Sequence, residues 1–151
     1  MHTIKQTFIT LASSLCLVAS GSALAQETPT AAPAGVKLVE AKAVQDLQAK
    51  GAVLIDTRKA NEFSDATIKG AISVPHDPEK SAKDANFDAA QDKYDLGKIA
   101  DKNKDYVVFC NSGTCWKSYK AAVMMAKAGY KNVHWYRNGV PDWKARKLPM
   151  D

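Results

Sequence analysis

Short apolar runs separated by polar turns follow one another along the chain from residue 36 onward. Runs rich in β-branched or aromatic residues and bounded by polar turns are typical of buried strands. Four runs meet this description and a weaker one precedes them, at residues 52–56, 71–74, 106–109, 133–135 and, first in the chain, 36–39. Because they are apolar without strict alternation, they favour a parallel sheet covered on both faces.

Two amphipathic stretches lie between these runs. Residues 40–50 place alanine, valine and leucine on one side and stop at Gly51, and residues 116–128 form an apolar stripe beside a lysine stripe and end at Gly129. Glycine after an amphipathic stretch is a common helix terminator. Strands that alternate with helices at this spacing predict an α/β fold.

Residues 76–105 form a different kind of segment, with 14 charged residues, eight acidic and six lysine, and few apolar ones. A connection of this length is usually partly helical or functional, for example as a lid. We expect a short helix near residues 96–100 and otherwise a solvated excursion.

The N-terminus has the layout of a secretory signal peptide. One lysine precedes an apolar stretch at residues 8–19, and Ala23, Leu24 and Ala25 form an A-x-A cleavage pattern. We therefore expect residues 1–25 to be removed and the mature protein to be periplasmic. Residues 26–35, with two prolines and no large apolar residue, are predicted to form a flexible leader. The remaining length suits one domain, at residues 36–148.

The charge balance says little about partners. Removing residues 1–25 leaves 20 basic and 16 acidic residues, a net charge of +4 without any basic cluster. This distribution argues against a nucleic-acid partner, and no apolar segment predicts stable membrane insertion. A mild preference for small anions is consistent with it.

The candidate chemistry lies where the strand at residues 106–109 ends. Cys110 follows this strand, and ligands of open α/β sheets bind at the carboxyl ends of strands. A loop of small residues and then a helix come next, and such a loop can direct backbone N–H groups at the sulfur. Both the amides and the helix N-terminus favour the thiolate, which is the nucleophilic form of cysteine.

Cys110 is thus the predicted catalytic residue, and Gly113 is expected to allow a positive φ. Lys117 and Lys120 could add positive charge at the mouth of the site, where they would attract an anion. The predicted anion-binding residues are those that follow the catalytic cysteine: Asn111, Ser112, Gly113, Thr114, Cys115, Trp116 and Lys117.

Three separate motifs resemble the rhodanese family of sulfurtransferases. The stretch DTRKANEFSDATIKGAISVP at residues 56–75 is similar to that family's D-x-R-x-x-x-E-F and H-I-x-G-A-I-x-V-P pattern. A cysteine at the end of a strand opens the active loop of these proteins, and GVPDW at residues 139–143 is similar to their glycine-then-tryptophan ending.

This resemblance implies a five-stranded, mainly parallel sheet with helices on both faces. It also implies that Cys110 takes a sulfane sulfur from a small anionic donor, such as thiosulfate, polysulfide or a persulfide, and passes it to a thiol or cyanide. Asp56 and Arg58 fall on the D-x-R positions and are expected to support the loop, although Arg58 also suits an exposed salt bridge. No metal or organic cofactor is implied.

The sequence departs from the family pattern in the loop. Asn111 stands where many members have arginine, and Ser118 lies eight residues after Cys110 where six is usual. The loop is therefore about two residues longer and could hold a bulkier donor. Thr67 replaces the histidine of the H-I-x-G stretch, a change expected to be cosmetic.

Alternatives to sulfur transfer concern the second cysteine. Cys110 and Cys115 could form a thiol–disulfide redox module, and Cys115 could be a resolving thiol or only a packing residue. A zinc site is disfavoured because only His76 and His134 remain in the mature chain. The sequence is also compatible with a non-catalytic binding module. In either case, a periplasmic sulfur-carrier or redox protein could be the partner.

Overall fold

The computed structural model describes residues 25–151, so the predicted signal peptide at residues 1–25 lies almost entirely outside the described part. The strands are β1 (Val36–Leu38), β2 (Val53–Asp56), β3 (Ile72–Ser73), β4 (Asp105–Phe109) and β5 (Asn132–Tyr136). They form one parallel sheet in the order β1-β5-β4-β2-β3. The predicted α/β fold and its five-stranded parallel sheet are confirmed.

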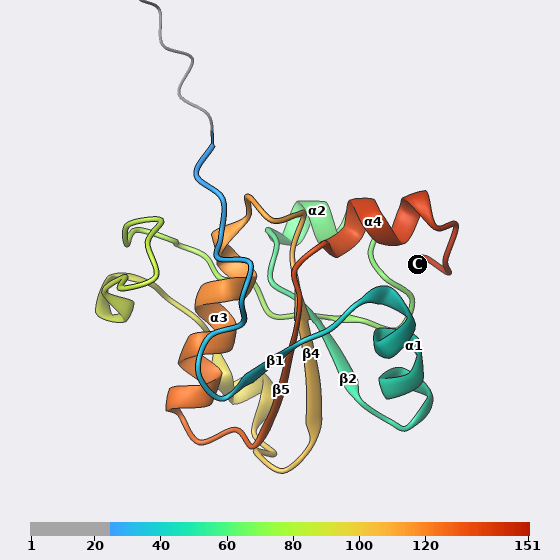
Figure 1. The fold of residues 1–151 in the computed structure, drawn as a ribbon, viewed down its shortest axis with the longest axis horizontal. Coiled ribbons are helices and arrows are strands. Elements are labelled where there is room, and N and C mark those ends of the chain that lie inside the picture. Colours follow the sequence, from blue (N-terminus) through green and yellow to red (C-terminus); the bar gives the residue numbers. More distant parts are fainter. Residues whose placement is uncertain (1–24) are drawn as a thin grey trace, which may run out of the picture.

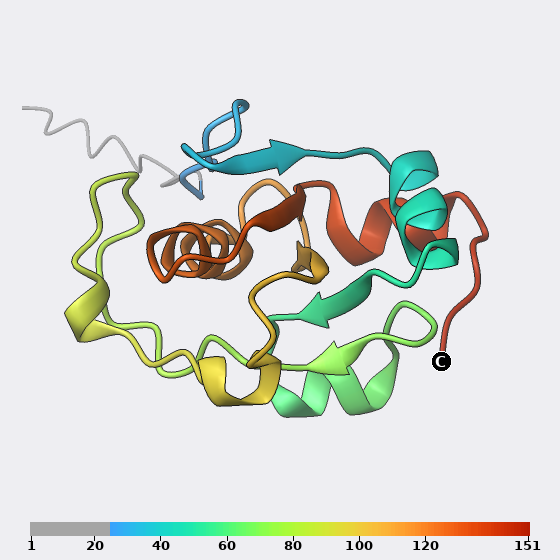
Figure 2. The same ribbon diagram turned by 90° about the horizontal axis from the view of Figure 1, so that it is seen from below.

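The helices cover both faces of this sheet. They are α1 (Ala41–Ala49), α2 (Ala60–Asp65), α3 (Trp116–Lys127) and α4 (Gly139–Ala145), with short 3-10 helices η1 (Ala89–Gln91) and η2 (Leu96–Ile99). Figure 2 shows α3 on one side of the strands and α1 and α4 on the other. In residues 25–151, none of these helices is both long enough and apolar enough to cross a bilayer.

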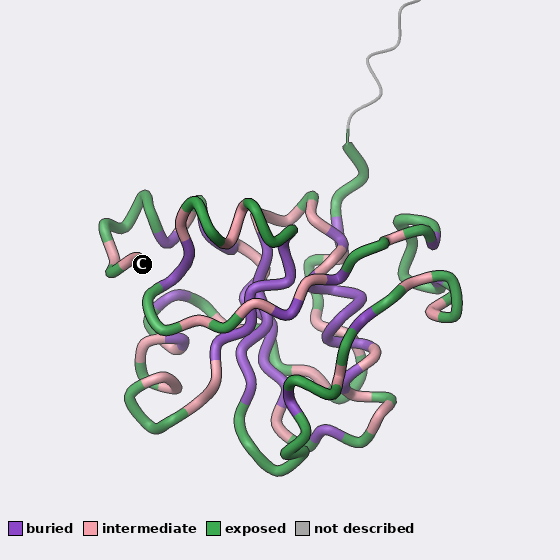
Figure 3. Tube along the Cα trace, turned by 180° about the vertical axis from the view of Figure 1, so that it is seen from behind, coloured by how far each residue is buried: buried purple, intermediate pink, exposed green. Residues whose placement is uncertain are grey.

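Side-chain alternation along the strands builds a core on each face. Leu54 and Val107 point into a cluster with residues of α1 and α4, whereas Ile55 and Val108 point into a cluster with residues of α3. Because successive side chains of a strand face opposite ways, buried strands need apolar residues at consecutive positions. Figure 3 shows the result, a buried centre at the strands with exposed loops around it.

The sequence pattern did not predict two of the helices, α2 and α4, and each omission has a physical reason. Helix α2 is short and contains no buried residue, so it has no apolar stripe that a pattern could reveal. Helix α4 begins with glycine and has proline at its third position, residues that usually indicate a turn. Both helices lie near the carboxyl ends of the strands (Figure 1), and Cys110 directly follows the carboxyl end of β4.

Candidate functional site

Cys110 follows the last residue of the central strand β4, and Cys115 is the residue immediately before α3. A disulfide joins the two, with Cα atoms 6.2 Å apart. Cys110 is 1 % exposed, whereas Cys115 is half-buried. The sequence therefore placed Cys110 correctly at the carboxyl end of a strand. The structure adds that Cys115, at the start of α3, is close enough to form a disulfide with it.

The predicted ring of amides around the sulfur is not present in this disulfide form. Within residues 25–151, no N–H group donates a hydrogen bond to Cys110 Sγ. The loop amides bond within the loop instead: the Cys115 N–H donates to the Ser112 carbonyl (3.0 Å), and the Thr114 N–H to the Ser112 hydroxyl (3.4 Å). A sulfur in a disulfide carries no negative charge, so it offers these donors little; the amide ring stays a prediction for the reduced loop.

The backbone of Cys110 is fixed by its neighbours on both sides. The Val140 N–H donates to the Cys110 carbonyl (3.0 Å), and a Cβ at Gly139, where φ is +62°, would lie 2.2 Å from that carbonyl oxygen. Only glycine tolerates both the φ value and the close approach. Thr57 donates to the Phe109 carbonyl through its N–H (3.1 Å) and its hydroxyl (2.9 Å), which joins the ends of β2 and β4.

Asp56 and Arg58 form a buried ion pair at the end of β2. Arg58 Nη2 lies 2.6 Å from Asp56 Oδ2 and also donates to the Ala66 carbonyl (2.7 Å), and the Thr67 hydroxyl donates to the same carboxylate (2.9 Å). Arg58 is 5 % exposed, so the interpretation as an exposed salt bridge is wrong. Thr67 is not a cosmetic replacement either, because its hydroxyl completes the hydrogen bonds of a buried carboxylate.

Asn111 fastens the loop to α2. Its side-chain N–H₂ donates to Glu62 Oε1 (2.8 Å), and this hydrogen bond lowers the pKa of the Glu62 carboxyl. The residue that stands where many members of the family have arginine thus donates, from an uncharged amide, to a carboxylate of a neighbouring helix.

The segment expected to be a flexible leader lies against the loop. Residues 26–29, here called the strap, run beside the start of α3 (Figure 1). The Thr28 N–H and hydroxyl both donate to the Gly113 carbonyl (2.7 and 2.6 Å), and the Trp116 indole N–H donates to the Gln26 carbonyl (2.8 Å). Thr28 is 2 % exposed. Composition could not reveal this docking, because backbone groups make most of the contacts.

Arg137, which follows β5, is the residue that clamps the strap. Its guanidinium donates to the Thr28 hydroxyl and carbonyl (3.1 and 3.0 Å), to the Pro29 carbonyl (3.1 Å) and to Glu27 Oε2 (3.2 Å). It also lies over Gly113, where a Cβ would stand 2.6 Å from it. A side chain at position 113 would therefore displace the Arg137 guanidinium from its place beside the strap. Gly113 does not have the positive φ that we expected.

Sequence analysis missed Arg137, although one signal was available. The ends of neighbouring parallel strands meet at one edge of the sheet, so the residue after β5 lies near the residue after β4. Arg137 therefore lies beside Gly113 of the loop, with its hydrogen bonds directed to residues 27–29.

The connection at residues 76–105 is mostly exposed, and its short helix η2 lies at Leu96–Ile99, as expected. Part of it is nevertheless pinned to α3 by a network of buried charged and polar side chains, which the sequence analysis did not predict. This network consists of His76, Glu79, Ser81, Asp92 and Lys120. Lys120 Nζ lies 2.9 Å from Glu79 Oε1 and 3.7 Å from Asp92 Oδ2, and it donates to the Ser81 carbonyl (3.1 Å). Lys120 is fully buried, so its predicted place at the mouth of the site is wrong.

The network also shifts the ionisation of two of its members. Burial lowers the pKa of His76, and its hydrogen bond to Asp92 (2.9 Å) offsets this only in part. Burial alone would raise the pKa of Asp92, but hydrogen bonds from the Ser81 hydroxyl and backbone and from His76 outweigh it and hold that pKa well below its ordinary value. The favoured state is a neutral histidine beside an ionised aspartate.

The remaining predicted loop residues are engaged within the protein. Lys117 Nζ donates to the His76 carbonyl (2.9 Å) and lies 3.7 Å from the Asp77 carboxylate. Trp116 is 2 % exposed and packs edge-to-face on Tyr119, so it belongs to the core beside the loop. His134 bonds to the Asp105 carboxylate at 2.9 Å, as a structural histidine would.

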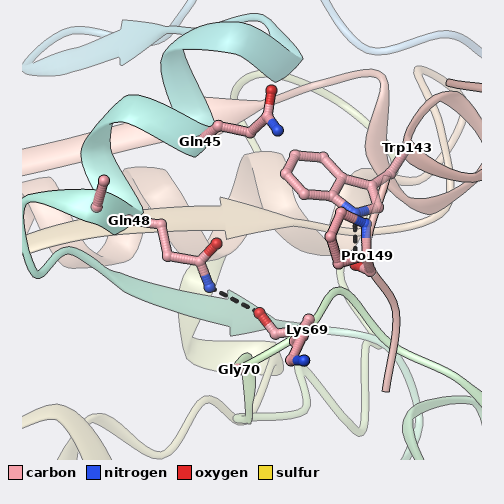
Figure 4. A pocket seen from close by; sticks show the side chains of 7 residues that line it. Gln45, Gln48, Lys69, Gly70, Trp143 and Pro149 are labelled. Atoms are coloured by element: carbon pink, nitrogen blue, oxygen red, sulfur yellow. Dashed lines mark hydrogen bonds between the residues drawn. The ribbon is translucent and has the colours of Figure 1, made fainter. Parts of the chain in front are cut away.

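A hollow of about 520 Å³ lies elsewhere on the molecule, and its lining includes no residue of the cysteine loop. Figure 4 shows Gln45 and Gln48 of α1 opposite Trp143 and Pro149, with the Gln48 side chain bonded to the Lys69 carbonyl. In the described part of the chain, no cluster of histidine, cysteine and acidic residues suits a metal ion.

Comparison with known proteins matches residues 40–146 to the family model described as the rhodanese-like domain. The thiosulfate sulfurtransferase GlpE of Actinobacillus succinogenes is 29 % identical over 105 residues, which cover 70 % of this chain and 80 % of that protein. A putative mitochondrial thiosulfate sulfurtransferase of Schizosaccharomyces pombe is 29 % identical over 94 residues, covering 62 % of this chain and 64 % of that one.

Solved structures show the same fold. A protein from Lactobacillus plantarum is 25 % identical with a TM-score of 0.57, covering 76 % of this chain and 86 % of that one. A rhodanese-related protein from Thermoplasma volcanium is 19 % identical with a TM-score of 0.57, covering 76 % of this chain and 97 % of that one. The strap lies before the matched family segment, whereas both cysteines lie inside it.

Proposed function

The chain belongs to the rhodanese-like family, and on that basis we propose that it passes a sulfane sulfur through a persulfide on Cys110. Relatives named thiosulfate sulfurtransferase support a sulfurtransferase function in general. The observation that carries the finer proposal is the position of Cys110 at the carboxyl end of the central strand, followed by a short loop and a helix N-terminus. In this setting the reduced sulfur is expected to be a thiolate.

The proposed reaction has two steps. The Cys110 thiolate attacks the sulfane sulfur of thiosulfate, polysulfide or a persulfide, and the donor leaves without that sulfur, as sulfite in the case of thiosulfate. A thiol or cyanide then takes the outer sulfur and frees Cys110. Because the structure holds Cys110 in a disulfide, the enzyme must first be reduced before it can accept sulfur.

Steady-state sulfur transfer from thiosulfate to cyanide by the reduced protein tests this proposal. Cys110→Ser should abolish the transfer, whereas Cys115→Ser, the matched change at the other cysteine, should retain it. Transfer that survives in Cys110→Ser would exclude Cys110 as the carrier. A panel of polysulfide and persulfide donors would show which donor the longer loop prefers.

A second candidate is a thiol–disulfide redox module, which the Cys110–Cys115 bond favours. It predicts that either cysteine variant abolishes disulfide exchange with a dithiol substrate. Retention of cyanide-directed sulfur transfer in Cys115→Ser would separate the two candidates, since a redox module needs both thiols.

We also propose that the protein acts in the periplasm. The A-x-A pattern at residues 23–25 and a disulfide between the two remaining cysteines both support an oxidising compartment. N-terminal sequencing of protein recovered from the periplasmic fraction should begin at Gln26. Recovery of the uncleaved chain from the cytosol would contradict this location.

A further inference from the structure

We propose that Cys115 is the thiol that resolves the Cys110 persulfide, so that the chain itself converts a sulfane sulfur to hydrosulfide. This inference rests on the proposed sulfur transfer and identifies the acceptor of its second step. The acceptor would be part of the protein, and the disulfide between the two cysteines would be the product of each turnover.

Proximity favours Cys115 as the thiol that attacks the inner sulfur of the persulfide, which is Cys110 Sγ. Cys110 is 1 % exposed, and its backbone is enclosed by Gly139 and Val140. In this disulfide form Cys110 Sγ is covered, and Cys115 is the thiol that lies against it. Cys115 Sγ has full access, because the disulfide places the two sulfur atoms in bonding contact with Cys115 still at the residue before α3.

The position of Cys115 also suits it to attack. It precedes a helix of 12 residues, and the positive N-terminal end of such a helix favours a thiolate. Cys115 as a residue is half-buried, whereas Cys110 is buried, so Cys115 is the side from which a reductant would approach the disulfide. Cys110 and Cys115 thus have different exposures that match a carrier and a resolving thiol.

The step balances without any further reactant. The Cys115 thiolate attacks Cys110 Sγ, a new S–S bond forms between the cysteines, and the bond to the outer sulfur breaks. The outer sulfur leaves with the electron pair as hydrosulfide. With thiosulfate as donor, the two thiols are oxidised to the disulfide, the sulfane sulfur is reduced to hydrosulfide, and sulfite is the other product.

The cycle then requires a reductant, and its chemical class follows from the product. A dithiol, as a small molecule or as a reduced thiol protein, must exchange with the disulfide, with attack at Cys115, the more exposed of the two residues. The reaction therefore depends on two other reactions, one that produces the sulfane-sulfur donor and one that keeps the dithiol reduced.

A single-turnover experiment tests this inference. The protein is reduced, freed of reductant under anaerobic conditions and mixed with thiosulfate without cyanide or added thiol. Sulfite, hydrosulfide and free thiols are then measured, and the intact mass is recorded. We expect one hydrosulfide and one sulfite per chain, with loss of both thiols and a final mass two hydrogens below that of the reduced chain.

Variants separate this inference from the proposed function. Cys115→Ser should release sulfite but no hydrosulfide and should retain one added sulfur on Cys110, until dithiothreitol releases it. Cys110→Ser should release neither product. A wild-type chain that keeps the sulfur on Cys110, or moves it to Cys115 as a persulfide, would overturn the resolving role but not the sulfur transfer. Absence of sulfite from wild type and Cys115→Ser alike would overturn the transfer itself.

Discussion

Two segments outside the central strands hold the surroundings of the cysteine loop, and they do so by different physics. The strap uses mainly backbone N–H and carbonyl groups and the guanidinium of Arg137. The connection at residues 76–105 uses buried charges, with Lys120 and Asp92 paired away from water. The strap precedes the segment that matches the family, whereas the buried network lies within it. We infer that the network stabilises the whole domain, whereas the strap orders only the cysteine loop beside it.

The largest expected effect follows from removing the buried cation. Lys120→Met leaves Asp92 and Glu79 without their positive partner, and breaking a buried ion pair in this way costs about 3–5 kcal/mol of unfolding free energy. Urea unfolding measures it. Lys117→Met, a matched change three residues earlier on α3 that removes a hydrogen bond near the surface, should cost about 1 kcal/mol. Equal effects of the two variants would contradict the difference between the segments.

Loss of the clamp on the strap should have a smaller and more local effect. Arg137→Gln removes the charged hydrogen bonds to residues 27–29, at about 1.5–3 kcal/mol if the strap contributes fully to the folded state. Hydrogen exchange should rise at residues 26–29 and in the loop, with little change at β2 or β4. Arg137→Lys keeps the charge and should restore part of the protection. Faster exchange throughout the sheet would show that the strap is part of the global fold.

Acidification should weaken the network and leave the backbone contacts of the strap intact. The lowered pKa of His76 means that the unfolded chain takes up a proton first, so stability falls as the pH drops below about 6.5. Three charged groups act on the His76 ring: Asp92 and Glu79 raise its pKa, and Lys120 lowers it. The lowered pKa of Asp92 means that its contribution is present above about pH 4 and is lost below it.

Unfolding measured between about pH 7.5 and about pH 5 tests the histidine part of this dependence. His76→Gln retains a side-chain N–H donor but cannot titrate, so its stability should vary less with pH in this interval. A variant with the same pH dependence as wild type would show that His76 is not the responsible group.

The smallest effect concerns the outer end of the strap. Trp116→Phe keeps an aromatic ring in the cluster with Tyr119 and removes the indole hydrogen bond to the Gln26 carbonyl, which alone is worth about 1 kcal/mol. Proteolysis before Thr28 should become faster, while the unfolding midpoint moves little. An unchanged cleavage rate would indicate that Arg137 alone holds the strap.

The sequence predicted the fold well because buried parallel strands leave a strong signal. Consecutive apolar residues at Leu54 and Ile55 are needed when both faces of a strand are covered, and this pattern identified the strands and the edge that bears Cys110. Helix α2 left no such signal because it buries nothing.

The surroundings of the loop could not be predicted in the same way. The strap is bound through backbone atoms, which every sequence has, and Lys120 looked like one of three lysines on an exposed stripe. Its burial depends on acidic partners that lie 28 and more residues earlier, and a linear pattern does not show which charges will meet. Long-range polar contacts are therefore the part of this site that only the three-dimensional structure supplies.

The sulfur-carrying role of Cys110 is tested most directly by mass spectrometry of the reduced Cys115→Ser protein after incubation with thiosulfate or a polysulfide. Peptide mapping should place one added sulfur atom on Cys110. A Cys110 thiol that is shown to be free and reduced, yet gains no sulfur from any of these donors, would contradict the account.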